Sequence, residues 1–274
     1  MQHNAHVHGP AQGQAHTCTV IFLHGRDSGA REFADELFES EASSGLAAAH
    51  TEQDRTLRGL LPTVRWVFPA AAMLHSQRFD AELCQWFDMW SVEDPEAESE
   101  IQRSGLQDSI KRVLALLETE EKLVPRNRIF LCGISQGFAT ALSLLFCDGR
   151  GGFAGLIGLC SWLPFSSVAE ATIEGHKSET SLFSTLQDLY CFGQDVAVAR
   201  PLPDRMLTTP VFLGHALDDA VVPVANGRRM KNVLSALGLD VEWHEYADGG
   251  HWVNEPQGVD DMLVFIKANC KQVA

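Results

Sequence analysis

The pentapeptide Gly133-Ile134-Ser135-Gln136-Gly137 carries the clearest chemical signal in the chain. It follows the apolar run 129–132 and opens a segment of helical pattern, so the serine is expected at a tight turn between a strand and a helix. The two glycines suit such a turn, because the backbone comes close to neighbouring elements and leaves no room for Cβ atoms. This context is typical of a nucleophile elbow and predicts a serine hydrolase.

A serine hydroxyl is a weak nucleophile at neutral pH, so the elbow predicts a histidine base farther along the chain. The histidines after the elbow are His176, His215, His244 and His251. His251 follows two glycines directly after the predicted strand 241–246, where a loop would present a base over the carboxyl edge of the sheet. The other three lie at the end of a strand, within a strand or in an irregular stretch. His251 is therefore predicted as the general base.

An acidic residue must orient that base, and in hydrolases of this kind it follows an earlier strand. The predicted strand 211–214 runs into a loop that contains Asp218 and Asp219. The spacing alone allows either aspartate to orient His251, and the other would then cap or solvate the turn.

The negative charge that develops during acyl transfer needs backbone N–H donors. One is expected from Gln136, the residue after the nucleophile. The other is expected from the loop that follows the predicted strand 18–23, which reads His24-Gly25-Arg26-Asp27-Ser28-Gly29. Arg26 is the natural donor in this loop, through its backbone amide.

Other chemistries find little support in the sequence. Cys132 lies inside the predicted strand before the elbow and is expected to pack rather than react. The chain has no H-E-x-x-H, no C-x-x-C and no phosphate-binding P-loop sequence, and Gly149–Gly152 follows no strand. We therefore expect no metal and no cofactor.

Strands and helices are predicted to alternate along most of the chain. Strands are expected at 18–23, 64–68, 129–132, 154–159, 211–214 and 241–246, and helices at 31–40, 101–117, 135–146, 224–237 and 259–269. This alternation predicts an α/β fold with a mainly parallel central sheet and helices on both faces. No linker divides residues 17–274, so they are expected to form a single domain. The irregular stretch 166–204 is interpreted as a lid-like excursion.

Composition narrows the classes of partner. The formal net charge is −15, which argues against nucleic acid and anionic membrane surfaces, and no apolar run is long enough to cross a membrane. The seven cysteines are scattered, which favours a reducing compartment over a disulfide scaffold. Residues 1–16 are rich in histidine and lack a signal-peptide pattern, so a flexible leader and a cytoplasmic location are expected.

The combined motifs resemble the phospholipase/carboxylesterase family, which includes acyl-protein thioesterases, and the long form looks most like its fungal members. The matching segments are Phe22-Leu23-His24-Gly25, Trp66-Val67-Phe68-Pro69, Trp86-Phe87-Asp88, Gly133-Ile134-Ser135-Gln136-Gly137, Ser161-Trp162-Leu163-Pro164, Thr209-Pro210-Val211, Asp219-Ala220-Val221-Val222-Pro223 and Gly250-His251. The resemblance implies an α/β-hydrolase fold.

By position, the resemblance implies a catalytic triad of Ser135, Asp219 and His251, with Arg26 and Gln136 forming the oxyanion hole. The loop after His24 is one residue shorter than the family's usual His-Gly-x-Gly-Asp-x-Gly, because the second glycine is missing. The stretch 166–204 is longer than in compact thioesterases.

The leading hypothesis is a carboxylesterase or thioesterase that forms an acyl-enzyme on a small-molecule ester or an acylated substrate, acting as a monomer or homodimer. Apolar residues predicted to bind the substrate are Leu74, Phe79, Trp86, Trp162 and Leu163, with core packing as the competing interpretation of Trp86. A second hypothesis is a hydrolase or acyltransferase for a secondary metabolite, with a pocket built by residues 166–204. A third is a catalytically silent binding module.

Overall fold

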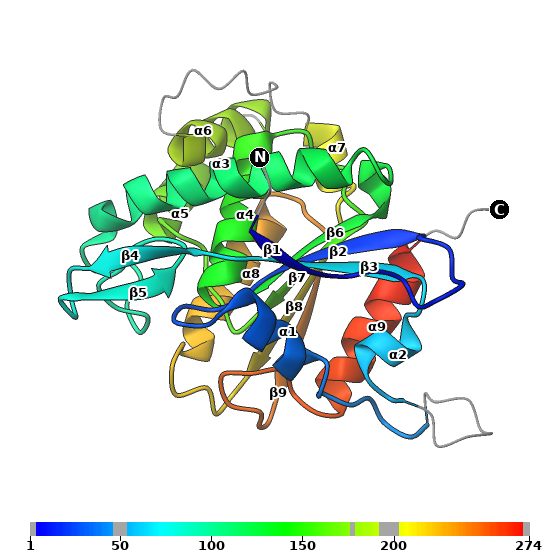
Figure 1. The fold of residues 1–274 in the computed structure, drawn as a ribbon. Coiled ribbons are helices and arrows are strands. Elements are labelled where there is room, and N and C mark those ends of the chain that lie inside the picture. The colour runs from blue at the N-terminus through cyan, green and yellow to red at the C-terminus, as the bar shows by residue number, and fades with distance from the viewer. Residues whose placement is uncertain (1–3, 46–53, 176–178, 192–202, 271–274) are drawn as a thin grey trace.

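A seven-stranded sheet forms the centre of the protein, as seen in a computed structural model that describes residues 4–45, 54–175, 179–191 and 203–270 (Figure 1). The strand order is β1-β3-β2-β6-β7-β8-β9, and every neighbouring pair is parallel except β1 with β3. The strands are β1 (Ala5–His8), β2 (Cys18–Leu23), β3 (Val64–Pro69), β6 (Ile129–Ile134), β7 (Gly155–Leu159), β8 (Val211–Ala216) and β9 (Val241–Tyr246).

Helices cover both faces of this sheet, as the sequence predicts (Figure 1). One face packs against α3 (Gln102–Glu120), α4 (Gln136–Asp148), α5 (Ser166–Glu174), α6 (Glu179–Cys191), α7 (Pro203–Leu207) and α8 (Val224–Ala236). The other face packs against α1 (Ala30–Leu37), α2 (Leu57–Leu60) and α9 (Gln257–Asn269). Short 3-10 turns at Ser99–Ile101 and Arg126–Arg128 precede α3 and β6. The central strands β2, β6, β7 and β8 are buried along their whole length, which explains why they read as continuous apolar runs.

A separate two-stranded hairpin follows β3 and consists of β4 (Ala72–Ser76) and β5 (Ala81–Gln85). Leu74 pairs with Leu83 across it. Both strands of the hairpin are short and largely outside the core.

The structure differs from the predicted flexible leader over residues 1–16 at one segment. Residues Ala5–His8 form β1, which pairs antiparallel with β3 from Ala5 opposite Pro69 to His8 opposite Trp66. A tract of small and polar residues can form an edge strand when a partner strand supplies the hydrogen bonds, and the sequence of the tract alone does not reveal that partner.

The prediction of a lid over residues 166–204 also needs correction. The described residues of this stretch form α5, α6 and the start of α7. Helix α6 packs against α4, where Tyr190 stacks on Phe146 with 5.7 Å between ring centroids. Phe183 and Leu186 are buried in the same core. Residues 176–178 and 192–202 lie outside the described residues. The described helices therefore add to the layer that covers the α4 face of the sheet.

The cysteines differ from the expectation of scattered free thiols. Cys18, at the start of β2, forms a disulfide with Cys270, after the end of α9. The Sγ atoms of Cys147 and Cys191 lie 2.6 Å apart. In the described parts of the chain, no helix has both the length and the apolar character needed to cross a membrane.

Candidate active site

The carboxyl ends of the parallel strands meet at one edge of the sheet, and the predicted site residues gather there. Ser135 lies at the turn between β6 and α4, with φ of 54° and ψ of −128°. Its amide donates to the carbonyl of Leu159, at the end of β7, over 2.8 Å, and its carbonyl accepts a hydrogen bond from Ser161 Oγ over 2.7 Å. A non-glycine residue with this backbone conformation is strained, so these contacts from the neighbouring strand hold the serine at the tip of the turn.

The glycines of the elbow are required by close packing. A Cβ atom on Gly137 would lie 2.3 Å from the carbonyl oxygen of Leu23, and one on Gly133 would lie 2.4 Å from the amide nitrogen of Phe138. The helix α4 can therefore cross the end of β2 only when residue 137 lacks a side chain.

Asp219 and His251 are brought together from the ends of β8 and β9. Asp219 Oδ2 lies 2.8 Å from His251 Nδ1, and Asp219 Oδ1 accepts hydrogen bonds from the amides of Val221 and Val222 at 2.8 and 2.9 Å. Burial would raise the pKa of Asp219, but hydrogen bonds from His215 and His251 and from the Val222 amide outweigh it and hold the pKa below its usual range. A carboxylate in this state can orient the imidazole and leave Nε2 available for chemistry.

The structure distinguishes the contacts of Asp218 and Asp219, whereas their spacing in the sequence allows either one to orient His251. Asp218 Oδ1 accepts a hydrogen bond from the amide of Gly250 over 2.8 Å, whereas Asp219 contacts the imidazole of His251. Asp218 thus fixes the loop that carries the histidine, and Asp219 fixes its ring.

His215 also contacts Asp219, and the sequence-based prediction gave it no role. Its Nε2 lies 2.9 Å from the carbonyl oxygen of Val222 and 3.3 Å from Asp219 Oδ2, and its side chain is almost completely buried. Because a carbonyl can only accept, Nε2 carries the proton and is shared between the two oxygens. The only sequence signal is its place at the end of β8, four residues before Asp219.

The loop after β2 approaches the serine closely. A Cβ on Gly25 would lie 3.7 Å from Ser135 Cβ. The amide of Asp27 donates to the carbonyl of Cys84 in β5 over 2.7 Å, and Asp27 adopts a φ of 59°, a conformation that aspartate tolerates. This contact fixes the backbone that carries Arg26, despite the missing glycine.

The side chain of Gln136 ties the elbow to the end of the hairpin. Its Oε1 accepts a hydrogen bond from the amide of Trp86 over 2.8 Å, and its Nε2 donates to the carbonyl of Phe87 over 2.7 Å. The Trp86 indole donates to the carbonyl of His24 over 2.8 Å. The elbow, the loop after β2 and the chain after β5 therefore form one hydrogen-bonded unit.

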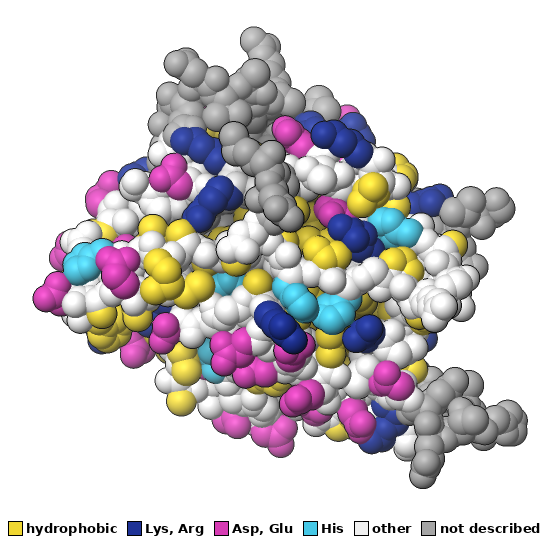
Figure 2. Space-filling view, viewed as in Figure 1, with side chains coloured by type: hydrophobic (Ala, Val, Ile, Leu, Met, Phe, Trp, Pro, Cys, Tyr) yellow, Lys and Arg dark blue, Asp and Glu magenta, His cyan; other side chains and the backbone are white. Residues whose placement is uncertain are grey.

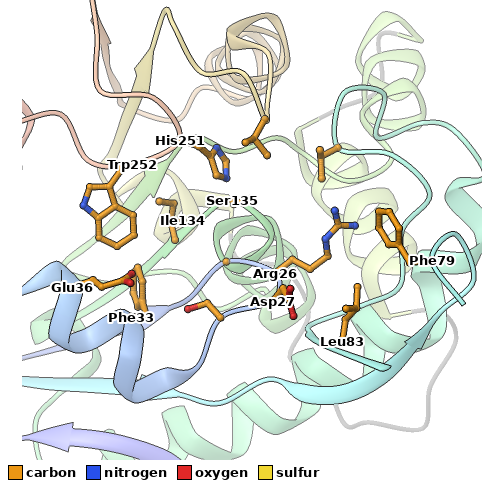
Figure 3. Close-up of a pocket in the computed structure, with 14 residues that line it drawn as sticks. Arg26, Asp27, Phe33, Glu36, Phe79, Leu83, Ile134, Ser135, His251 and Trp252 are labelled. Carbon is orange, nitrogen blue, oxygen red and sulfur yellow. The ribbon is translucent and has the colours of Figure 1, made fainter. Parts of the chain in front are cut away.

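A cavity of about 500 Å³ opens beside Ser135 and His251 (Figure 3). Arg26 and Phe79 lie at one end, where the guanidinium carbon is 5.4 Å from the ring centroid, and Phe33 and Trp252 lie at the other. Burial lowers the pKa of Arg26, with the neighbouring Arg78 as the next cause. The lining residues are Gly25, Arg26, Asp27, Ser28, Phe33, Glu36, Phe79, Leu83, Val92, Ile134, Ser135, Val221, His251 and Trp252.

Of the predicted substrate-binding residues, Phe79 lines this cavity. Trp86, Trp162 and Leu163 are instead buried in the core, and Leu74 lies in β4, where it packs toward α3 near Gly105. An aromatic side chain can line a cavity or pack in the core, and its residue type does not tell the two apart. The sequence-based prediction missed Phe33, because its helical spacing on α1 indicates only a side chain that packs in the core.

Two groups of side chains in the described residues could supply metal ligands. Cys160, Asp219 and His251 form one, within the site described above. His6, His8 and Asp35 form the other, on a different surface at β1 and α1.

Comparison with known proteins places the chain in a family. The sequence profile of the phospholipase/carboxylesterase family matches residues 4–185 and 196–270. The chain is 26% identical over 263 residues to acyl-protein thioesterase 1 of Yarrowia lipolytica and 28% identical over 265 residues to acyl-protein thioesterase 1 of Gibberella zeae. These alignments cover 94% of this chain in both cases, and 94% and 92% of the relatives.

The crystal structure of acyl-protein thioesterase 2 from Zea mays has the same fold. The TM-score is 0.66 and the sequence identity 23%, with 97% of this chain and 99% of the other covered. The profile match spans nearly the whole sheet and the elements that hold Ser135, Asp219 and His251. This protein therefore belongs to the phospholipase/carboxylesterase family.

Proposed function

We propose that this protein hydrolyses carboxylic esters or thioesters through an acyl-enzyme on Ser135. The observation that carries the proposal is the 2.8 Å contact between Asp219 and His251 at a cavity that Ser135 also lines. Relatives named acyl-protein thioesterase and carboxylesterase add support.

In the first step, Ser135 Oγ attacks the acyl carbon while His251 Nε2 accepts the hydroxyl proton. Asp219 stabilises the resulting imidazolium, and the amides of Arg26 and Gln136 donate to the oxyanion. The imidazolium then protonates the leaving alcohol or thiol as the acyl–oxygen or acyl–sulfur bond breaks. Water repeats the sequence with the acyl-enzyme, releasing the carboxylic acid and restoring the free serine.

The test compares Ser135→Ala with Ser235→Ala, a control on the exposed side of α8. We expect Ser135→Ala to lose nearly all turnover of a p-nitrophenyl acyl ester and all labelling by a fluorophosphonate probe. The control should keep both. Full turnover by Ser135→Ala would refute the mechanism, and a wild-type protein that neither labels nor turns over would favour the silent binding module.

The substrate is proposed to be a small ester or an acylated molecule whose acyl chain enters the cavity between Phe79 and Phe33. Parallel assays with oxygen esters and thioesters of equal acyl length would give the preference. The alternative of a pocket built by residues 166–204 has no support among the described residues, since none of them lines the cavity.

The monomeric or homodimeric state is part of the same proposal, as is the cytoplasmic location. The Cys18–Cys270 disulfide is unusual for the cytoplasm of a mesophile, so thiol labelling of the protein taken directly from its cell would test the location.

A further inference from the structure

His6 and His8 lie two residues apart on β1, so their side chains leave the same face of the strand. Their Nε2 atoms are 2.8 Å apart, and one ring lies edge-on to the other with centroids separated by 4.6 Å. The ring of His8 also packs edge-on against Phe38, which follows α1, at 5.1 Å. Two imidazole nitrogens therefore converge on one point, and the ring of His8 is held by packing.

A carboxylate from another element approaches the same point. Asp35 lies on α1, which contacts β1, and its carboxylate and the two imidazole nitrogens all lie within 4.8 Å of one another. Asp35 is exposed, and its ion pair with the largely exposed Arg31 is a loose one at 3.6 Å. It can therefore turn toward the histidines at little cost.

The surroundings on the α1 side are acidic. A surface cavity of about 810 Å³ next to the histidines is lined by His6 and by the carboxylate residues Glu32, Asp35, Glu36 and Glu39. Among the described residues that line it, Arg31 is the basic one. In the view of Figure 2, acidic side chains gather over the lower part of the molecule, around α1. The net charge of −15 adds to the attraction for cations.

We propose that His6, His8 and Asp35 form a binding site for a divalent transition-metal ion. Two imidazoles and one carboxylate suit zinc, cobalt or nickel better than magnesium or calcium, which prefer oxygen ligands. Ligand atoms at about 2.0–2.1 Å from a tetrahedral zinc ion lie roughly 3.3 Å apart. A slight opening of the histidine pair and a rotation of Asp35 would give that arrangement, with water completing the shell.

The ion would join the edge strand β1 to α1. Glu36 of the same helix lines the cavity beside Ser135, so the two sites share an element. The metal would thus act as a structural link next to the active site and take no part in ester cleavage, and this proposal does not depend on the proposed function.

The experiment titrates Zn²⁺ into the untagged full-length protein by calorimetry and follows the visible absorption of bound Co²⁺. We expect one ion per chain, a rise in Tm with Zn²⁺, and a Co²⁺ spectrum of low coordination number. His6→Ala and His8→Ala should each abolish stoichiometric binding, and Asp35→Asn should weaken it by at least tenfold.

His75→Ala is the matched control. His75 lies in the exposed hairpin within 3.6 Å of Asp80 and 3.8 Å of Glu82, so it offers one imidazole and two carboxylates but no histidine pair. It should leave binding unchanged. The metal-free Tm of each variant checks that the fold is intact.

Two results would overturn the proposal. One is a wild-type protein that takes up no stoichiometric Zn²⁺ or Co²⁺ in the micromolar range. The other is binding that survives His6→Ala and His8→Ala but is lost in His251→Gln, which would locate the ion at the triad residues.

Discussion

The buried imidazole of His215 lies 3.3 Å from the same oxygen of Asp219 that contacts His251. Asp219 Oδ2 is thus held by two imidazoles, while its other oxygen is held by two backbone amides. Both oxygens of this carboxylate are therefore hydrogen-bonded. The orientation of Asp219 depends in part on His215, a residue that does not line the cavity.

His215→Gln should lower kcat because Asp219 loses one of the donors that fix it. A hydrogen bond to a charged group is worth about 1.5–3 kcal/mol, which corresponds to roughly a 10- to 150-fold loss in rate. KM should change little, since His215 does not line the cavity. Steady-state kinetics on a p-nitrophenyl ester measure both. His244→Gln, in the edge strand β9, is the control, and an equal loss in both variants would contradict the positioning role.

Asp219→Asn should reduce kcat far more than Asp218→Asn. An asparagine cannot stabilise the imidazolium and favours the wrong tautomer of His251, which costs on the order of 10⁴-fold in a comparable serine protease. Asp218→Asn keeps an oxygen that can accept from the Gly250 amide, so its effect should stay within about tenfold. Equal losses in the two variants would show that the roles of the two aspartates are wrongly divided.

The depressed pKa of Asp219 gives a pH dependence with a definite sign. A carboxyl group whose pKa is lower in the folded protein stabilises it above the unfolded pKa, about 3.9, and this stabilisation is lost as pH falls toward the folded pKa. Urea unfolding should therefore show a stability loss below about pH 4 that is smaller in Asp219→Asn. An equal loss of stability over this pH range in Asp219→Asn and in the wild type would contradict the assignment.

Gly137→Ala should prevent the elbow from forming. Its Cβ would lie 2.3 Å from the Leu23 carbonyl and 2.4 Å from the His24 carbonyl, and backbone atoms cannot yield as a side chain can. We expect a loss of soluble protein or a drop in unfolding free energy of about 3 kcal/mol or more, beyond the usual range for a point change. Gly250→Ala tests backbone conformation without crowding, because nothing lies within 4 Å and only its φ of 61° opposes the change, so it should destabilise less.

Cys270→Ala should lower the free energy of unfolding by about 2–4 kcal/mol, because the disulfide to Cys18 constrains the unfolded chain. Cys84→Ala, which removes a half-buried free thiol, is the control. Denaturant unfolding with and without reductant gives both values. If reductant leaves the wild-type midpoint unchanged, the bond does not form in solution.

The parallel strands and the order of Ser135, Asp219 and His251 along the chain could be predicted from the sequence. Buried strands are continuous apolar runs, and these three residues follow the strands β6, β8 and β9. The strand limits at Cys18–Leu23 and Val241–Tyr246 agree with the prediction. The family and the α/β-hydrolase fold are confirmed by the comparisons. The triad and oxyanion roles stay predictions, although the structure brings their residues to one place.

The remaining features depend on contacts distant in the sequence. The edge strand β1 depends on β3, more than 50 residues away, for its hydrogen bonds. His215 differs, because Asp219 is only four residues away and its role depends on the turn after β8 that brings the two side chains together. The choice between Asp218 and Asp219 required the position of the Gly250 amide. The cavity is also built from segments that are distant in the sequence, since Phe33 and Phe79 line its opposite ends.

The hairpin of β4 and β5 stands outside the main sheet, yet it carries Phe79 and Leu83 to the cavity. Its hydrogen bonds to the rest of the site pass through the chain that follows it, where Gln136 contacts Trp86 and Phe87, and through the Asp27–Cys84 contact. Phe79 takes no part in these hydrogen bonds, so substitutions of this one side chain are expected to reshape one end of the cavity while the backbone around Ser135 keeps its position.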